Sequence, residues 1–589
     1  MGQIWIRELV GGLDVRRLPE TTPGGVLLAG TDGHITRGGE FESRASFVDA
    51  YTLPAGTVGL AYMRTGLVAF GSTAEPSGMP VGFIYQRLQH PDGSTELIDV
   101  PSFDLYSGKI YAVGVFADGS THHFYDGARV EDWFDGSARA TFRVTGGESS
   151  TPSKITSIKV NGVEILVTTV NWTTSNAVTA EAIASQINST LSDPEYTAIA
   201  VDENVVILAS DQGEAINDAP VIITVADGFA TVPAGDTTVT GSIVMTGGAE
   251  AEDTFDPGTF VKTFGSKVYS VSGPNMHFSG IQQPTKWTTD AVGAGFIDMS
   301  SYASGSENLV ALAKYQSNIA VFAEGVIQIW YTDPDPTLNR TVQDLNNTGT
   351  SSPLSVTQFG DGDIFYLDES GIRSLRARDS SNAASTNDIG VAIDPLVTAK
   401  LQSLSDTERS RVIGLIEPTD GRFWLIMKDV IYVLSYFSGG GAKGVSAWTT
   451  YEPGFTTTAA VVFNKRVVLR SGDSVYVYGG LGSTLEYDAI EAVAQLPYLD
   501  GDQPTQGKKL KGVDAAVRGE WVVHLALNPG NEDAKDKVGT ITGSTFMNGK
   551  LRANGSFTHV SPIFRSSGTG PHTLGSIVIH FESADGTDK

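Results

Sequence analysis

The sequence predicts a mainly β protein: a β-propeller-like core with an inserted small α+β domain and a C-terminal β-sandwich. Pairs of short strands with alternating apolar and polar residues recur along most of the chain, and a period of two is typical of antiparallel sheets. The 67 glycines and the many Val, Thr, Tyr and Phe residues favour strands and tight turns over long helices. The strand pairs recur roughly every 40–55 residues, which suits propeller blades.

A chain of 589 residues is too long for one hydrophobic core, so several domains are expected. We predict an N-terminal arm over residues 1–50 and the first propeller strands over 51–149. The inserted α+β domain then occupies 150–248, the remaining propeller blades 249–480, and the C-terminal β domain 481–589. Glycine and proline punctuate the arm every few residues, which predicts an extended segment with short strands.

The pattern of apolar and polar residues in the inserted region differs from that in the rest of the chain. "ITSIKVNGVEILVTTV" predicts a hairpin, because the Asn-Gly pair at 161–162 supplies the positive φ angles of a two-residue turn. A helix is predicted next, with one apolar face made of Ala180, Ile183, Ala184 and Ile187. Two more strands, "YTAIAVDENVVILAS" and "APVIITVADG", complete a compact unit between two Gly-Gly pairs.

After the insertion the strand pairs resume, each ending near an aromatic residue. "NLVALAKYQSNIAVFAEGVIQIWYT" at 308–332 is typical, with strands, a short turn and a closing Trp. Large rings at such places fill the wedge between neighbouring sheets. We therefore expect core positions, rather than a sugar-binding surface, for Trp287, Trp330, Trp424 and Trp448. From Leu481 onward, apolar and polar residues still alternate, but the spacing of the blades is lost. This pattern predicts the terminal β-sandwich.

Composition excludes several kinds of protein. The chain has no cysteine, so disulfides and thiolate metal sites are excluded. Its formal net charge is −27, and no arginine occurs between Arg143 and Arg340. Such a chain is not expected to grip a nucleic-acid backbone, which requires stripes of Lys and Arg. The excess of carboxylates either serves solubility or makes a surface that repels DNA. We expect neither a membrane-spanning segment nor a signal peptide, and folding in a cytoplasm.

Catalytic motifs are weak. His122 and His123 are neighbours on a predicted strand and would point to opposite faces, so they cannot share a metal. Glycan hydrolysis needs two carboxyls held in a cleft. Three acidic pairs are candidates: Asp333 with Asp335, Asp361 with Asp363, and Asp500 with Asp502. Aspartates this close in sequence are more often turn formers. We predict no catalytic residue and no enzyme activity.

The sequence has no complete metal-binding or cofactor-binding motif. "DPDPTLNRTVQD" has the alternating oxygens of a calcium loop but lacks the glycine at position 6 and ends on Asp344 rather than Glu. "GTDGHITRGGEFE" fails likewise. "GGLGSTLEYD" and "YFSGGGAKGVS" are glycine-rich but do not form a phosphate-binding loop. Both are interpreted as long hairpin turns, and no metal or cofactor site is predicted.

Several segments together resemble one family, the tail nozzle or tail tubular protein B (tail hub) proteins of short-tailed bacteriophages. Three of the segments are "LVALAKYQSNIAVFAEGVIQIWYT", "DIFYLDESGIRSLRARDSSNAASTNDIGVAIDPLV" and "GRFWLIMKDVIYVLSYF…AWTTYE". The N-terminal "GGLDVRRLPE…GGEFESRASF" and the late "LPYLDG…GKKLKGVDAAVRGEW" also resemble tail proteins. The inserted "ITSIKVNGVEILVTTVNWTTSNAVTAEAIASQIN" resembles an accessory domain of phage tail proteins.

The resemblance implies a structural protein of the virion, assembled in the host cytoplasm. It implies a homohexameric ring at the distal end of the tail, through which the genome is retained and then ejected. Partners would be the tail adaptor ring, tail fibres or tip proteins, and genomic DNA that passes without specific binding. The alternative function is a tail-associated β-propeller protein that degrades or binds glycans.

Overall fold

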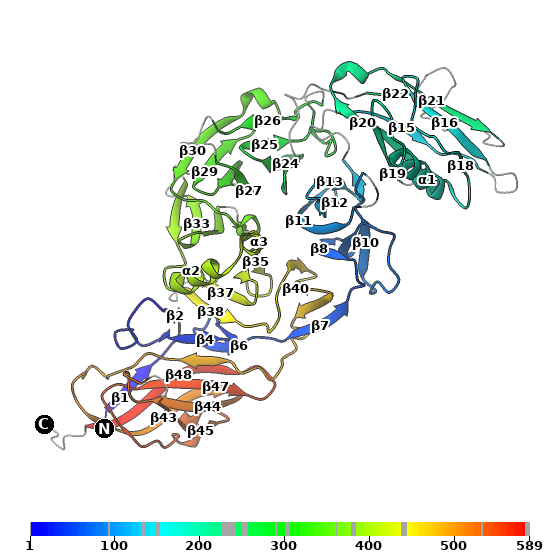
Figure 1. Cartoon of the computed structure of the whole chain (residues 1–589). Coiled ribbons are helices and arrows are strands. Elements are labelled where there is room, and N and C mark those ends of the chain that lie inside the picture. The colour runs from blue at the N-terminus through cyan, green and yellow to red at the C-terminus, as the bar shows by residue number, and fades with distance from the viewer. Residues whose placement is uncertain are drawn as a thin grey trace. The chain divides into compact units, whose positions relative to one another are not determined.

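The structure is a computed structural model (Figure 1). It describes residues 2–583 except 92, 94, 131–136, 148–152, 202, 227–242, 247, 249–256, 289–290, 301–306, 361, 378–383, 438–443 and 532–533. The chain divides into two compact units. Unit 1 comprises Met1–Ala55, Ala313–Tyr331 and Thr341–Lys589, and unit 2 comprises Gly56–Leu312 and Thr332–Arg340.

Small, mostly antiparallel sheets built from strands consecutive in sequence make up much of unit 2. The first sheet contains β8 (Val58–Met63), β9 (Gly66–Gly71) and β10 (Phe83–Arg87), with β10 parallel to β9. The second contains β11 (Leu97–Tyr106), β12 (Lys109–Phe116), β13 (Thr121–Tyr125) and β14 (Ala128–Arg129). The third contains β23 (Phe260–Phe264), β24 (Lys267–Ser272), β25 (Asn275–Phe278) and β26 (Gly295–Asp298).

Unit 1 contains further sheets of the same kind. One, which lies mostly in this unit, consists of β27 (Leu309–Tyr315), β28 (Asn318–Ala323), β29 (Val326–Tyr331) and β30 (Arg340–Asn346). The next consists of β31 (Thr357–Phe359), β32 (Asp363–Asp368), β33 (Gly371–Ala377) and β34 (Ala384–Asp388). The third group of four strands is one end of a longer sheet and consists of β35 (Ile413–Glu417), β36 (Arg422–Met427), β37 (Val430–Phe437) and β38 (Val445–Tyr451).

The last sheet joins the two ends of the propeller segment. It contains β39 (Ala459–Phe463), β40 (Arg466–Ser471), β41 (Ser474–Tyr478) and, from the N-terminal region, β7 (Phe47–Thr52). β7 runs antiparallel to β41, with Phe47 opposite Tyr478. Sequential four-stranded meanders are the repeat unit of a propeller, so the prediction of a mainly β, propeller-like core is confirmed. The boundary placed at residue 50 is wrong, because it cuts through β7.

The inserted domain has the predicted hairpin and helix. Asn161 and Gly162 both have positive φ, and α1 (Asn176–Asn188) buries the predicted apolar face and is capped by the Ser175 side chain. The strands of one sheet are β15 (Ser137–Arg143), β20 (Asn204–Gln212) and β19 (Tyr196–Val201). Those of the other are β16 (Lys154–Val160), β17 (Val163–Glu164), β18 (Val170–Asn171), β21 (Pro220–Ala226) and β22 (Ile243–Val244). Because β15 pairs with β20, the domain starts at 137 rather than at the predicted 150.

The C-terminal domain is a two-sheet structure that incorporates much of the predicted arm. One sheet contains β43 (Lys508–Arg518), β46 (Ser556–Phe557), β48 (Thr573–Ser583), β1 (Gly2–Ile6), β5 (Gly33–Ile35) and β6 (Phe41–Ser43). The other contains β4 (Ala29–Thr31), β42 (Val493–Gln495), β47 (Ser561–Ser567), β44 (Glu520–Ala526) and β45 (Lys535–Ile541). Residues of both sheets, Trp521 and Ile577 among them, share one buried cluster.

β4 connects this domain to the propeller sheet of unit 1. It pairs with β42 on one side and, at Thr31 opposite Thr450, with β38 on the other. A single nine-stranded sheet therefore runs from β35 to β45. The glycine-rich segment 479–488 lies between β41 and β42, which belong to different sheets. It is a link rather than the predicted hairpin turn.

Short elements complete unit 1: the parallel pair β2 (Gly12–Leu13) and β3 (Val26–Leu27), and the helices α2 (Asp394–Ser403), α3 (Asp406–Arg409) and α4 (Thr545–Asn548). α2 buries Val397 and Leu401 in a cluster with Phe423 of β36 and Trp448 of β38. The helix therefore packs on the propeller sheet that precedes the C-terminal domain.

Lys508 holds a loop of the C-terminal domain in place. Its side chain is fully buried, and Nζ donates to the carbonyl oxygens of Gln503 at 2.6 Å, Gln506 at 3.0 Å and Thr558 at 3.2 Å. Lys508→Met leaves these acceptors without their donor, so we expect the free energy of unfolding to fall by about 1–3 kcal/mol. Urea unfolding measures it. Lys509→Met, at the exposed neighbour, should change it by less than about 0.5 kcal/mol, and an equal loss would contradict the role of Lys508.

Candidate functional site

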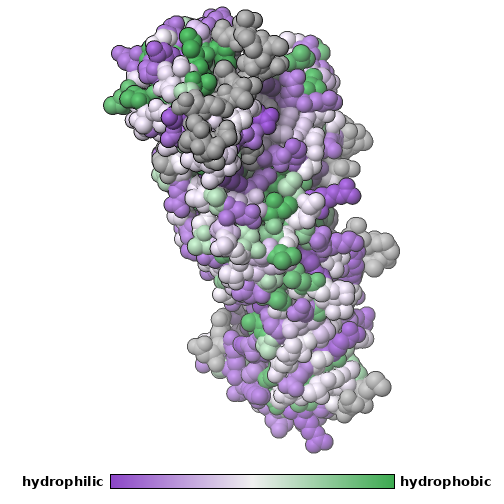
Figure 2. Space-filling model, turned by 90° about the vertical axis from the view of Figure 1, so that its right-hand side faces the viewer, coloured by the Kyte–Doolittle hydropathy of each residue, from purple (hydrophilic) through white to green (hydrophobic). Residues whose placement is uncertain are grey.

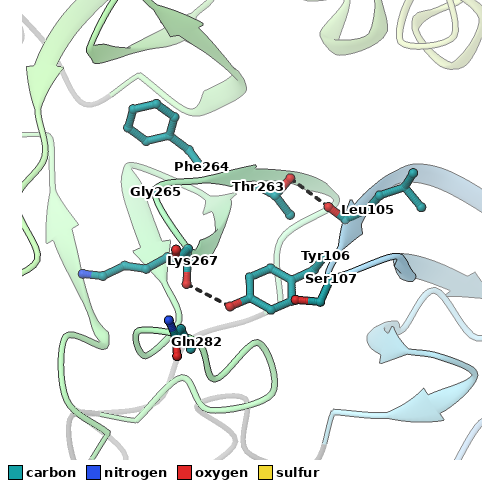
Figure 3. A pocket seen from close by; sticks show the side chains of 9 residues that line it. Leu105, Tyr106, Ser107, Thr263, Phe264, Gly265, Lys267 and Gln282 are labelled. Carbon is teal, nitrogen blue, oxygen red and sulfur yellow. Dashed lines mark hydrogen bonds between the residues drawn. The ribbon is translucent and has the colours of Figure 1, made fainter.

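The first candidate site is a pocket of about 600 Å³ in unit 2, where the β11–β12 turn meets the β23–β24 turn (Figure 3). Tyr106 Oη donates to Ser266 O at 3.0 Å, and Thr263 Oγ1 donates to Leu105 O at 3.2 Å. Asp104 accepts from Thr263 N at 2.8 Å. These three hydrogen bonds link one sheet to the next, as a structural contact between blades would.

Lys267 is the charged residue of this pocket, but its amine faces elsewhere. The residue is 2 % exposed, and Nζ donates to Gly293 O at 2.7 Å and to Pro334 O at 3.4 Å. Figure 3 shows the side chain pointing away from Tyr106. Burial lowers the pKa of Lys267, and the nearby carboxylates of Asp333 and Asp335 oppose that shift. The amine thus fixes two loops and offers no nucleophile to the pocket.

A second pocket, of about 870 Å³, lies in unit 1 between α2 and the loop after β38. Lys400 pairs with Asp429 at its wall. Tyr432 Oη donates to Leu396 O at 3.3 Å, and burial raises the pKa of Tyr432 to about 12. Lys400, Asp429 and Tyr432 therefore bond other groups of the protein. Among the described residues of this wall, no general base contacts a nucleophile.

Asp333 and Asp335, the first acidic pair, act as turn formers. Asp333 accepts from Asp335 N at 3.0 Å, and Asp335 accepts from Thr337 N at 3.0 Å and from Thr337 Oγ1 at 2.7 Å. These hydrogen bonds lower the pKa of Asp335, which suits a turn former better than a general acid.

Of the other two pairs, only Asp500 with Asp502 forms such a turn, whereas Asp363 lies in β32 and bonds a residue of the neighbouring strand β33. Asp500 accepts from Asp502 N at 3.0 Å. Asp363 accepts from Ser374 Oγ, and burial raises the pKa of Asp363. Asp361 lies outside the described residues. No described pair therefore faces a cleft as two separated carboxyls.

His122 and His123 lie on opposite faces of β13, as predicted. His122 packs against His90 and Phe116 at centroid distances of 5.1 and 5.6 Å. His123 contacts Tyr111 Oη at 3.1 Å and Gly258 O at 2.8 Å. Burial lowers the pKa of His122 to about 3 and that of His123 to about 4. Their lowered pKa values make both histidines neutral at pH 7. Among the described residues no group of three or more His, Asp or Glu side chains is placed to hold a metal ion.

The tryptophans lie in the core. Trp287, Trp330, Trp424 and Trp448 are each at most 3 % exposed. The Trp424 ring meets Tyr478 at 4.9 Å and Tyr451 at 5.4 Å, both nearly perpendicular. The prediction that these four rings are core residues is confirmed. None of them is an open platform for a sugar.

The surface is largely polar on the face shown in Figure 2, with apolar residues scattered among hydrophilic ones. Large exposed apolar residues such as Val81 and Leu191 are single loop positions, which is normal for a protein surface. Across the described residues, the helices are too short or too polar to cross a membrane.

No family model and no curated protein matches the chain. Among solved structures it is similar to BamB from Moraxella catarrhalis, at 12 % identity and a TM-score of 0.29, over 74 % of this chain and 96 % of that one. It is also similar to the Pan2 WD40 domain of Neurospora crassa, at 9 % identity and a TM-score of 0.27, over 66 % and 90 %. With scores this low, the fold assignment rests on the sheets themselves: this chain is a mainly β protein built of propeller-type blades.

Proposed function

We propose that the chain is a structural subunit of a bacteriophage tail, forming the distal nozzle or hub ring through which the genome is retained and then ejected. The observation that carries the proposal is how the segments resembling that family are arranged. The three blade segments coincide with consecutive strands, β27–β29, β32–β34 and β36–β38. The N-terminal and late segments, nearly 500 residues apart, contact each other, with Tyr498 N donating to Pro19 O at 3.1 Å.

Further support comes from the way the arm is built in. The arm supplies a strand to the last propeller sheet and strands to both sheets of the C-terminal domain. Leu28 N also donates to Gln495 O at 2.8 Å. Because the N-terminal arm pairs with strands near the C-terminus, unit 1 is expected to resist local opening. Such a unit suits a rigid ring subunit better than an enzyme that opens about a hinge. Both the arm and the late segment are parts of the chain that resemble tail proteins.

The charge supports the passage of DNA. The chain has 67 Asp and Glu against 40 Lys and Arg, a net charge of −27, and like charges repel phosphates at short range. We therefore propose that genomic DNA passes the ring without specific binding. The adaptor ring above and the fibres or tip proteins below are the proposed protein partners, and the virion tail is the proposed location.

The test is the mass of the protein in solution, alone and with the tail adaptor protein, by native mass spectrometry and light scattering. We expect a ring near six times 62.3 kDa, formed alone or only on the adaptor, and no retention of duplex DNA at low salt. If the protein stayed a monomer and did not bind the adaptor protein, the proposal would be overturned. If that monomer cleaved or bound glycans, the alternative function would take its place.

A further inference from the structure

The loop between β2 and β3, here called the arm loop (residues 14–22), carries three consecutive exposed residues (Figure 1). They are Arg16, Arg17 and Leu18, and Leu18 is 68 % exposed. Arg17 Nε lies 3.4 Å from Asp14 Oδ2, whereas no carboxylate of the described residues pairs with the Arg16 guanidinium. Arginine and large apolar side chains are the usual anchors of protein interfaces, so this loop is a candidate contact for another surface.

Hydrogen bonds hold the arm loop in one shape. Leu18 O accepts from Thr21 N at 2.9 Å, from Thr21 Oγ1 at 3.1 Å and from Thr22 Oγ1 at 3.0 Å. The next carbonyl, of Pro19, accepts from Tyr498 N at 3.1 Å. Because the backbone on either side of the Leu18 side chain is already fixed, little conformational entropy is lost when that side chain binds a partner.

The second pocket of unit 1, here called the α2 groove, offers accessible apolar surface. One wall is a single face of α2, since its residues have the i, i+3, i+4 and i+7 spacing of neighbours on a helix: Leu396, Ala399, Lys400 and Ser403. Leu396 is 38 % exposed and Ala399 is also exposed. The volume of about 870 Å³ has room for a short peptide segment, because drug-sized ligands occupy about 300–1,000 Å³.

The other wall of the α2 groove is the loop after β38, where an aromatic ring is held in place. Phe455 is half-buried, and its ring stacks on Tyr476 with centroids 3.8 Å apart and planes 9° apart. Phe47 meets the same ring nearly perpendicularly at 5.8 Å. The groove therefore has a fixed aromatic wall and an aliphatic helix wall, which suit an aliphatic side chain between them.

The charges that line the α2 groove leave one carboxylate over. Lys400 pairs with Asp429. Glu452 is exposed, and Asp32 Oδ1 accepts from its backbone N at 3.0 Å. No lysine or arginine of the described residues pairs with the Glu452 carboxylate. The groove thus favours an occupant with an apolar side chain and a nearby cation.

We propose that the arm loop of one copy of this chain docks in the α2 groove of the next copy. Leu18 packs between Leu396 and Phe455. The Arg16 guanidinium pairs with the Glu452 carboxylate, an arrangement for which the planar guanidinium is well suited. No residue of the arm loop lines the groove of its own chain, so a second copy is the occupant that the chain itself supplies.

This contact would join the subunits of the ring, and the inference therefore rests on the proposed function. Arm loop and α2 groove are different surfaces of one chain, so their contact is heterologous. Heterologous contacts repeated from copy to copy can close into a ring.

The chain has no cysteine, so thiols placed by substitution can be cross-linked without background. Full chains carrying Leu18→Cys are mixed with full chains carrying Ala399→Cys, with the tail adaptor protein present, and treated with a short bis-maleimide. We expect a cross-linked dimer that contains one chain of each variant, identified by mass spectrometry. Val81→Cys, at a 95 % exposed position, replaces Leu18→Cys as the control and should give at most about a tenth of that product.

Charge reversal tests the ion pair. Arg16→Glu and Glu452→Arg should each weaken assembly by about tenfold or more, because each places like charges together. The double variant should recover assembly to within about threefold of the wild type, since the pair is restored with its charges exchanged. Lys465→Glu, an equal change of charge at another exposed position of unit 1, should change assembly by less than about twofold. All these positions are exposed, so thermal midpoints should equal that of the wild type.

The outcomes separate this contact from the tail proposal. If rings form but the mixed thiol variants are not cross-linked, or the double variant does not recover, the contact is wrong and the ring stands. If cross-links join two Leu18→Cys chains instead, the heterologous contact is also wrong. If the mixed cross-link forms and charge exchange restores it, but only in a dimer that does not bind the adaptor, the contact stands and the tail proposal fails. A monomer with no cross-link overturns both.

Discussion

Replacing Arg44 with methionine is expected to lower the free energy of unfolding of unit 1 by about 3–5 kcal/mol, the cost of leaving a buried charge unpaired. Arg44 and Asp32 have side chains 3 % and 5 % exposed, and Nε lies 2.6 Å from Oδ1. Nη1 also donates to Ala45 O at 2.9 Å. Removing the guanidinium leaves the Asp32 carboxylate in the core, where burial already raises its pKa.

This pair matters because of where it lies in the chain. Both residues are in the N-terminal region, just before β7 closes the last propeller sheet. Asp32 Oδ1 also accepts from Glu452 N at 3.0 Å, at the end of β38. The pair therefore fastens the arm to the propeller sheets of unit 1. Sequence reasoning missed it, because no local pattern joins position 32 to position 452.

Urea unfolding followed by tryptophan fluorescence measures the effect. The control is Arg37→Met, an exposed arginine of the same segment whose guanidinium covers Phe437 at 4.5 Å; it should cost about 1 kcal/mol or less. In Arg44→Met the loss should be larger at pH 8 than at pH 5, because an unpaired buried carboxyl is more easily kept protonated at low pH. If the two variants lost the same free energy of unfolding, the buried Arg44–Asp32 pair would contribute no more to stability than the exposed Arg37, and the prediction would be wrong.

Acid should destabilise unit 2 well before its carboxylates are protonated. Burial lowers the pKa of His123 to about 4 and that of His277 to about 3, from an ordinary 6.5. His123 Nε2 faces the Gly258 carbonyl and so carries the proton, which leaves Nδ1 to accept from Tyr111 Oη. Below pH 6.5 the unfolded chain binds protons that the folded chain excludes, so stability is full above pH 6.5 and falls as the pH drops toward 4.

At pH 5 each of these two histidines should cost about 2 kcal/mol relative to pH 8, or about 4 kcal/mol together. His277→Leu tests one of them. Whatever it costs at pH 8, that cost should shrink by about 2 kcal/mol at pH 5, because the variant no longer has this proton to exclude. Met276→Leu, at the buried neighbour on β25, should cost the same at both pH values. An unchanged cost of His277→Leu between pH 8 and pH 5 would contradict the prediction.

Local patterns in the sequence determined much of this protein. Alternation and tight turns predicted the blade strands, since side-chain direction in a strand depends on neighbours only. The Asn161-Gly162 hairpin and the apolar face of α1 followed from turn geometry and helical period. The core tryptophans and the turn-forming aspartates were likewise local inferences.

The tertiary structure alone decided which distant strands meet. Nothing near Phe47 shows that β7 completes a sheet with β41, and nothing near Ala29 shows that β4 joins a propeller sheet to the C-terminal domain. The same holds for Asp32, whose carboxylate accepts from Glu452 N at the end of β38. Sheet pairing and buried charge depend on which surfaces meet in the folded chain, and neither propensity nor period carries that information.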